Sequence, residues 1–181
     1  MKNLSIQLDE IQVYVGTYHK YNSGSLAGDW VNLSQFSDFE EFQEFINELH
    51  SDEDDPEFMY QDFECPELFK SMELISECHI SENIFDVIEA LEAAYLDIEV
   101  YSAYASHTGF SGDIEDLISA AEEAYQGEFE SDEDFAQNMA EDLGLIQDRP
   151  AWPHYCIDWE YAARELMYDY FEESGYYFRS L

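Results

Sequence analysis

The chain has 181 residues, of which 43 are Asp or Glu and only 6 are Lys or Arg, so its formal net charge is -37 at neutral pH. A disordered acidic tail combines such charge with few apolar residues, whereas 46% of this chain is hydrophobic and 17% is aromatic. We therefore expect a folded, highly charged protein. The scarcity of Lys and Arg argues against phosphate binding and the negative charge against membrane attachment, so a basic partner is expected.

The N-terminal 66 residues predict a module of sheet and helix. Ser37 and Glu40 have the spacing of a capping box, and the apolar residues that follow recur at helical spacing to about His50. Pro66 marks the end of this module. Alternating apolar residues predict strands at 11–15, 30–33 and 58–63.

Residues 67–110 form the second predicted module. Its pattern is wholly helical from about Leu68 to His107, where Ser81 precedes apolar residues at helical spacing. The glycines of the segment 108–112 end this module.

Residues 111–181 form the third predicted module, of helices and a small antiparallel sheet. Pro150 and Pro153 mark a loop between its helices. Helices are expected at 113–125, 131–143 and 158–168, a short extended segment at 126–129, and a terminal hairpin at 168–179. The predicted fold class is therefore α+β, with three small modules in a row.

The usual chemical motifs are missing from the sequence. The acidic run Asp52 to Asp55 lacks EF-hand spacing and is interpreted as a solvated loop. The five His and three Cys residues lack the spacing of a zinc site, and the serines near His107 lack a nucleophile elbow. We therefore assign no catalytic residue, cofactor or metal, and expect a protein that is not an enzyme. Acid/base catalysis by a pair of carboxylates stays open.

Acidic residues occur in every predicted module, often on the helix face opposite the apolar stripe. An ordinary solvated surface mixes both signs of charge, so the near absence of Lys and Arg predicts a surface that binds cationic groups. The residues predicted for this surface are Glu40, Glu41, Glu44, Glu48, Asp52, Glu53, Asp54, Asp55, Glu122 and Glu123.

The magnitude of the charge favours an extended arrangement of the modules. B-DNA carries one charge per roughly 1.7 Å of axis, so 37 charges correspond to roughly 63 Å of duplex. A single globule of this length would have a diameter of about 40 Å. The estimate predicts an elongated row of modules rather than one sphere.

Three segments of the chain carry recognisable motifs: the first runs from Tyr14 to Trp30, the second from Leu49 to Glu64 and the third from Ile157 to Leu166. Together they resemble the ArdA antirestriction family, and the third is similar to the antirestriction motif of that family. The residues predicted to carry this motif are Asp158, Trp159, Glu160, Tyr161, Arg164, Glu165 and Leu166.

The resemblance implies a three-domain, homodimeric mimic of B-form DNA that dimerises through its C-terminal domain. Its implied partner is a Type I restriction-modification enzyme, bound at the methyltransferase core with its specificity subunit, and no nucleic acid is bound directly. It also implies a gene carried on a plasmid, transposon or phage. Inhibition of restriction is expected, and inhibition of modification stays open. Arg164 is interpreted as a structural residue, in an internal ion pair or at the dimer interface.

Two other interpretations fit the composition. The chain would then be an acidic binder of another basic DNA-binding protein, or a protein of different function with a surface adapted to high salt. The first ten residues lack the apolar core of a signal peptide, and Cys65, Cys78 and Cys156 form an odd, widely spaced set. These features predict a cytoplasmic protein.

Overall fold

The computed structural model describes residues 11–146 and 156–181, and their contacts divide the chain into two compact units. The first unit comprises residues 1–102 and 111–118, and the second comprises residues 103–110 and 119–181. The described residues form eight α-helices and three small antiparallel sheets, which confirms the predicted α+β class. The predicted module boundaries after residues 66 and 110 remain a prediction.

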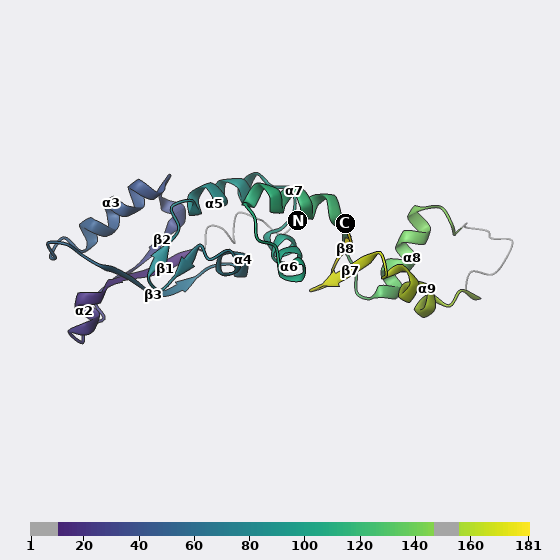
Figure 1. Ribbon diagram of the computed structural model, residues 1–181, viewed down its shortest axis with the longest axis horizontal. Coiled ribbons are helices and arrows are strands. Elements are labelled where there is room, and N and C mark those ends of the chain that lie inside the picture. Colours follow the sequence, from purple (N-terminus) through teal and green to yellow (C-terminus); the bar gives the residue numbers. More distant parts are fainter. Residues whose placement is uncertain (1–10, 147–155) are drawn as a thin grey trace. The chain divides into compact units, whose positions relative to one another are not determined.

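A three-stranded antiparallel sheet of order β2-β1-β3 anchors the first unit (Figure 1). The central strand alternates, so that Val13 and Val15 are buried on one face while Tyr14 lies on the other. The three strands are β1 (Gln12–Thr17), β2 (Asp29–Asn32) and β3 (Phe58–Glu64). Their positions agree with the three strands predicted from alternation.

Helix α3 (Phe39–Leu49) lies along one side of this sheet (Figure 1). Its Phe42 and Ile46 are buried, and burial of each side chain contributes about 2 kcal/mol. Two short helical segments lie next to the sheet in sequence, α2 (Tyr18–Asn22) and the 3₁₀ turn η1 (Leu33–Gln35).

The start of α3 corrects the predicted capping box by one residue. Asp38, not Ser37, is the N-cap, and its Oδ1 accepts from the backbone N–H of Glu41 at 2.9 Å. Glu41 in turn accepts from the backbone N–H of Ser37 through Oε2 at 2.8 Å. The helix therefore has a reciprocal cap of the predicted kind, but Asp38, which directly precedes the first helical residue, takes the N-cap position predicted for Ser37.

The prediction that residues 68–107 are wholly helical is wrong at residues 75–80. Helix α4 (Glu67–Ser71) is followed by a hairpin of β4 (Ile75–Ser76) and β5 (His79–Ile80). The helix stops because Glu73 adopts φ +56° and the backbone N–H of Leu74 donates to the carbonyl of Phe69. Glycine usually occupies that left-handed position. Because a glutamate occupies it here, no signal in the sequence marked the end of the helix.

Helix α5 (Ile84–Ala93) also belongs to the first unit. The next helix, α6 (Ile98–Thr108), begins in the first unit and ends in the second. Phe85 of α5 packs near Phe42 of α3, with ring centroids 6.4 Å apart. Helix α7 (Ile114–Ala124) follows, and its N-terminal residues belong to the first unit and its C-terminal residues to the second.

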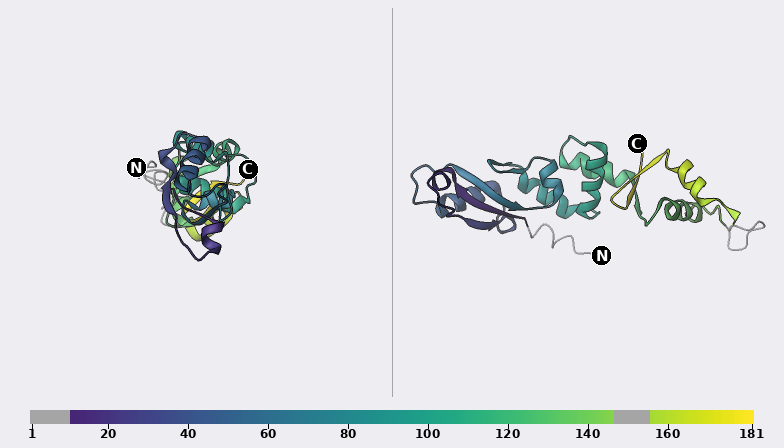
Figure 2. Two further views of the ribbon diagram at one scale, coloured as in Figure 1. Left: turned by 90° about the vertical axis from the view of Figure 1, so that its left-hand side faces the viewer. Right: turned by 90° about the horizontal axis from the view of Figure 1, so that it is seen from below.

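The second unit is built on a sheet of order β6-β8-β7, drawn in green and yellow in Figure 2. Tyr177 and Phe178 of β8 are buried, and Phe129, Phe135 and Tyr104 surround them. The sheet consists of β6 (Tyr125–Glu128), β7 (Tyr170–Glu173) and β8 (Tyr176–Arg179), and the helices α8 (Asp132–Asp142) and α9 (Trp159–Leu166) pack against each other. The predicted terminal hairpin is confirmed. The loop predicted at Pro150 and Pro153 lies outside the described residues.

A hydrogen bond from Tyr177 links this sheet to α8. The Tyr177 hydroxyl donates to Oδ1 of Asp132 at 2.7 Å. Burial, together with that carboxylate, raises the pKa of Tyr177 above its ordinary value. The phenol therefore stays protonated and keeps its hydrogen bond across the physiological range. None of the helices in the described ranges is long and apolar enough to cross a membrane.

Candidate acidic interaction surface

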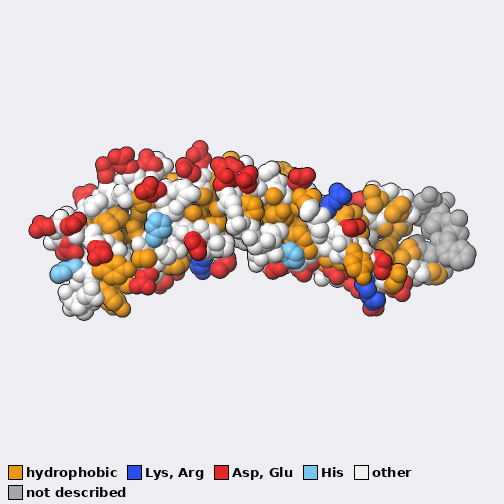
Figure 3. Space-filling view, viewed as in Figure 1, with side chains coloured by type: hydrophobic (Ala, Val, Ile, Leu, Met, Phe, Trp, Pro, Cys, Tyr) orange, Lys and Arg blue, Asp and Glu red, His pale blue; other side chains and the backbone are white. Residues whose placement is uncertain are grey.

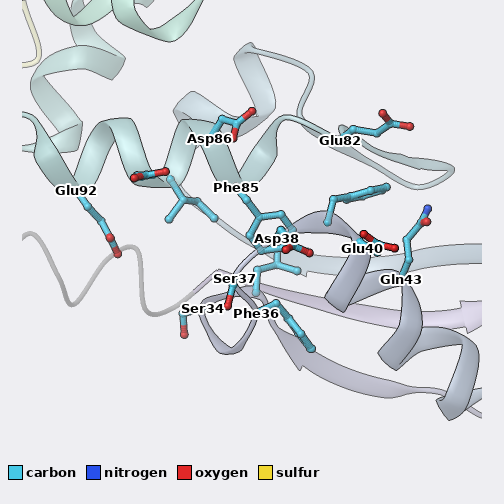
Figure 4. Close-up of a pocket in the computed structure, with 14 residues that line it drawn as sticks. Ser34, Phe36, Ser37, Asp38, Glu40, Gln43, Glu82, Phe85, Asp86 and Glu92 are labelled. Carbon is cyan, nitrogen blue, oxygen red and sulfur yellow. The ribbon is translucent and has the colours of Figure 1, made fainter.

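A groove of about 990 Å³ between α3 and α5 has a strongly acidic lining (Figure 4). Its apolar floor includes Leu33, Phe39 and Phe85. Among the described residues that line it there is no Lys, Arg or His. The groove acids, all exposed, are Asp38, Glu40, Glu82, Asp86, Glu89 and Glu92.

The groove acids come from both sides of the groove. Asp38 and Glu40 belong to the start of α3, and Glu82 precedes α5 (Figure 4). Asp86 and Glu89 lie three residues apart on α5, and Glu92 follows after three more, so they share one side of the helix. Figure 3 shows acidic side chains gathered over both helices. Because none of the described residues that line the groove is a cation, its carboxylates can receive basic groups from outside.

The sequence prediction found one of the groove acids and missed five. Glu40 lines the groove, whereas Glu41, Glu44 and Glu48 are exposed on α3 without lining it. The three-residue spacing on α5 was a usable signal, but nothing in the sequence showed that α5 faces α3. The acids missed are Asp38, Glu82, Asp86, Glu89 and Glu92.

The four acids of the predicted loop after α3 have two different environments. Asp54 and Asp55 are exposed, but Asp52 and Glu53 form ion pairs with Lys20 at 2.8 and 3.5 Å. The Glu53 side chain is only 12% exposed and accepts from the hydroxyl of Thr17 at 2.7 Å. Asp52 and Glu53 are therefore partly neutralised by the chain itself.

The ammonium group of Lys20 occupies the centre of this cluster. Ligand atoms of His50, Asp52 and Glu53 lie within 4.8 Å of one another, which is close enough for a metal ion. Nζ of Lys20, however, lies 2.9 Å from Nδ1 of His50 as well as beside both carboxylates. A positive charge from the chain thus takes the position that a metal cation would need.

Ionisation of the Lys20–Asp52 pair reflects this geometry. The hydrogen bond from Lys20 lowers the pKa of the Asp52 carboxyl, and the same bond raises the pKa of the Lys20 ammonium. Both groups are therefore held in their charged forms. The other predicted acids, Glu122 and Glu123, lie exposed on α7 in the second unit.

The predicted antirestriction motif, in the third segment of the resemblance, forms helix α9. Asp158 is its N-cap and accepts from the backbone N–H of Tyr161 at 3.0 Å. Arg164 donates to Glu160 at 3.1 Å, one turn apart on the exposed side of the helix. Glu165 and Tyr161 are exposed, while Trp159 and Leu166 are half-buried. An exposed pair of this kind contributes at most about 1 kcal/mol.

A comparison with protein families matches residues 13–178 to the model of the antirestriction protein ArdA. This chain belongs to the ArdA antirestriction family. The match confirms the predicted resemblance and includes both the acidic groove and α9. The function at this level is antirestriction. A comparison with curated proteins finds no match.

Proposed function

We propose that this ArdA-family protein inhibits restriction by imitating the charge of DNA and occupying the DNA-binding groove of a Type I restriction-modification enzyme. The groove acids carry the proposal, because six exposed carboxylates face one groove that no described cation lines. The carboxylates take the place of phosphates in pairing with Lys and Arg of the enzyme. No substrate is turned over in this mechanism.

The spacing of the acids on α5 suits this role. A helix rises about 1.5 Å per residue, so acids three residues apart, as Asp86, Glu89 and Glu92 are, repeat about every 4.5 Å along the axis. One strand of B-DNA presents a phosphate about every 3.4 Å. The linear charge density of this helix face is therefore comparable to that of one DNA strand.

Three of the chain's cations pair with other carboxylates and not with the groove acids. Lys20, Lys70 and Arg164 each lie within 4 Å of an acidic side chain that is not part of the groove lining. The groove acids consequently hold mobile counterions in solution. Their release on binding favours association and makes it strongly dependent on salt.

The proposal includes a homodimer formed through the second unit. Large apolar side chains are exposed there just after the end of α8 and on α9, including Leu143, Leu145 and Tyr161. Exposed apolar groups favour association. A two-fold dimer would double the acidic footprint and suit an enzyme that binds a long duplex. The contacts on the enzyme are the methyltransferase core and its specificity subunit.

The deciding measurement is ATP-dependent cleavage of unmodified DNA by a Type I enzyme, with competition between that DNA and the purified protein for the enzyme. Inhibition with competition is expected. An active enzyme that cleaves normally, and binds DNA equally well with the protein present, would contradict the proposal. Methylation assayed in the same mixture tests whether modification, which needs the same DNA, is inhibited too.

A combined variant tests the groove itself. Replacing Glu40, Glu82, Glu89 and Glu92 with Gln and Asp86 with Asn should weaken competition at least about ten-fold and reduce its salt dependence. The matched control exchanges Asp and Glu at the same five positions, which keeps every charge. Equal inhibition by the neutralised and the charge-keeping variants would remove the groove from the mechanism.

A further inference from the structure

The outer face of the N-terminal sheet carries an aromatic pocket of about 530 Å³. Tyr14, at the centre of the sheet, pairs with Trp30 on β2 and with Asp62 on β3. Residues opposite each other in an antiparallel sheet project from the same face, so these three side chains form one row. The Tyr14 and Trp30 rings meet edge to face, with centroids 5.6 Å apart.

The loop between β1 and β2 closes the pocket on one side. The hydroxyl of Tyr14 donates to the carbonyl of Leu26 at 2.8 Å, and Leu26 and Tyr21 both line the pocket. Gly28 lets the loop come this close, because a Cβ there would lie 2.3 Å from the carbonyl oxygen of Val15. Figure 3 shows hydrophobic side chains exposed beside α2.

A bulge in β3 places an amide in the same pocket. The register shifts between Tyr14 and Val15, so Gln61 is the extra residue on β3, and its side chain lies over Gly16. Nε2 of Gln61 is buried and has no hydrogen-bond acceptor within the described residues. A buried N–H without an acceptor is unfavourable.

The charges around the pocket select the kind of occupant. Asp62 and Glu77 line it, and no Lys, Arg or His is found among its described lining residues. A guanidinium group stacks on aromatic rings and donates to carboxylates in one plane, which an ammonium group does less well. We infer that this pocket, lined by Tyr14, Tyr21, Trp30 and Asp62, binds an arginine side chain of the protein that the chain inhibits.

This inference deepens the proposed function and rests on it for the identity of the partner. Carboxylates imitate phosphate charge, but a phosphate backbone has no aromatic pocket of this kind. The contact between an arginine and these rings excludes water, so salt weakens it less than it weakens an exposed ion pair. The pocket would therefore anchor the complex at salt concentrations that loosen the rest of the acidic surface.

The test compares two capped peptides of equal charge, Gly-Arg-Gly-Arg-Gly and Gly-Lys-Gly-Lys-Gly, binding to the full-length protein in about 0.15 M salt. The arginine peptide should bind about five-fold more tightly and shift the NMR signal of the Trp30 indole N–H. Trp30→Ala should abolish the preference. Phe45→Ala is the control, since Phe45 on α3 is 42% exposed and Trp30 is 41% exposed.

Equal binding of the two peptides to the wild-type protein, or an arginine preference that survives Trp30→Ala, would overturn the inference. If Trp30→Ala fails to fold, Tyr21→Ala serves instead, because α2 has no buried residues. A preserved arginine preference in a protein that does not inhibit cleavage would count against the proposed function and leave the pocket standing. Inhibition of cleavage without any arginine preference would overturn the pocket inference and leave the proposed function standing.

Discussion

Nζ of Lys20 lies 2.9 Å from Nδ1 of His50, a buried imidazole thirty residues further along the chain. An ammonium group can only donate, so Nδ1 accepts and Nε2 of His50 donates to the carbonyl of Val15 at 3.2 Å. The imidazole thereby links the end of α3 to β1. The acidic loop is held to the sheet through the same lysine.

Replacing Lys20 with Met should destabilise the fold by about 1 to 3 kcal/mol, because it leaves Nδ1 of the buried His50 without its donor and Glu53 without its counter-ion. The matched control is Lys70→Met, which removes an exposed pair with Glu67 and should cost no more than about 1 kcal/mol. Urea unfolding followed by circular dichroism measures both. Equal losses of stability would show that Lys20 has no special role.

The pH dependence of stability should depend on Asp52, whose pKa is lowered in the folded state. A lowered pKa stabilises the fold above the ordinary value of 3.8, and that contribution is lost as pH falls through the folded value. Asp52→Asn should therefore be less stable than wild type near neutral pH and converge with it in acid. Melting temperatures from about pH 2 to 7 test this, and a gap that stays constant down to the lowest pH would contradict it.

Gly28→Ala should destabilise the first unit by about 1 to 3 kcal/mol, since the new methyl group would overlap the backbone of Val15 and the ring of Tyr14. Gly24→Ala is a useful comparison because its Cβ would meet no atom within 4 Å. That substitution is unfavourable only through its φ of +81°, at about 1 to 2 kcal/mol. Thermal unfolding of both variants, with NMR of Trp30, reports stability and pocket geometry together. An undistorted indole signal in a stable Gly28→Ala protein would contradict the close approach.

Arg164→Gln should leave charge mimicry almost unchanged and act on stability or dimerisation. Its exposed pair with Glu160 accounts for no more than about 1 kcal/mol of folding stability. A larger effect should appear as dissociation of the proposed dimer, which light scattering after size-exclusion chromatography measures. Glu160→Gln, the matched control, should also change inhibition little. Normal melting and normal dimerisation of Arg164→Gln would show that the residue has no structural role.

The protein should remain folded at low salt if its charge serves recognition. Burial of aromatic and aliphatic side chains in both units supplies stability that needs no high concentration of counterions, although repulsion among carboxylates makes added salt stabilising. We expect a cooperative melt at about 0.05 M salt. Unfolding that is reversed only by molar salt would instead favour a protein adapted to high salinity.

Much of the local structure was predictable because it depends on neighbours in sequence. Asp158 and Ser131 precede apolar periodic segments and do cap α9 and α8. Alternation in β1 and in the terminal hairpin was equally clear. The local rules failed where one residue adopted an unusual conformation, as Glu73 does at the end of α4.

The acidic composition and the block from Tyr14 to Trp30 were enough, without any structure, to predict a folded chain with a basic partner and to show its resemblance to the ArdA family. Tertiary structure decided which acids lie together. It brings Glu40 of α3 and Asp86 of α5 to one groove, and it withdraws Glu53 from solvent by pairing it with Lys20. The reason is physical: charge is a property of each residue, whereas a groove and an ion pair depend on contacts between segments far apart in the chain.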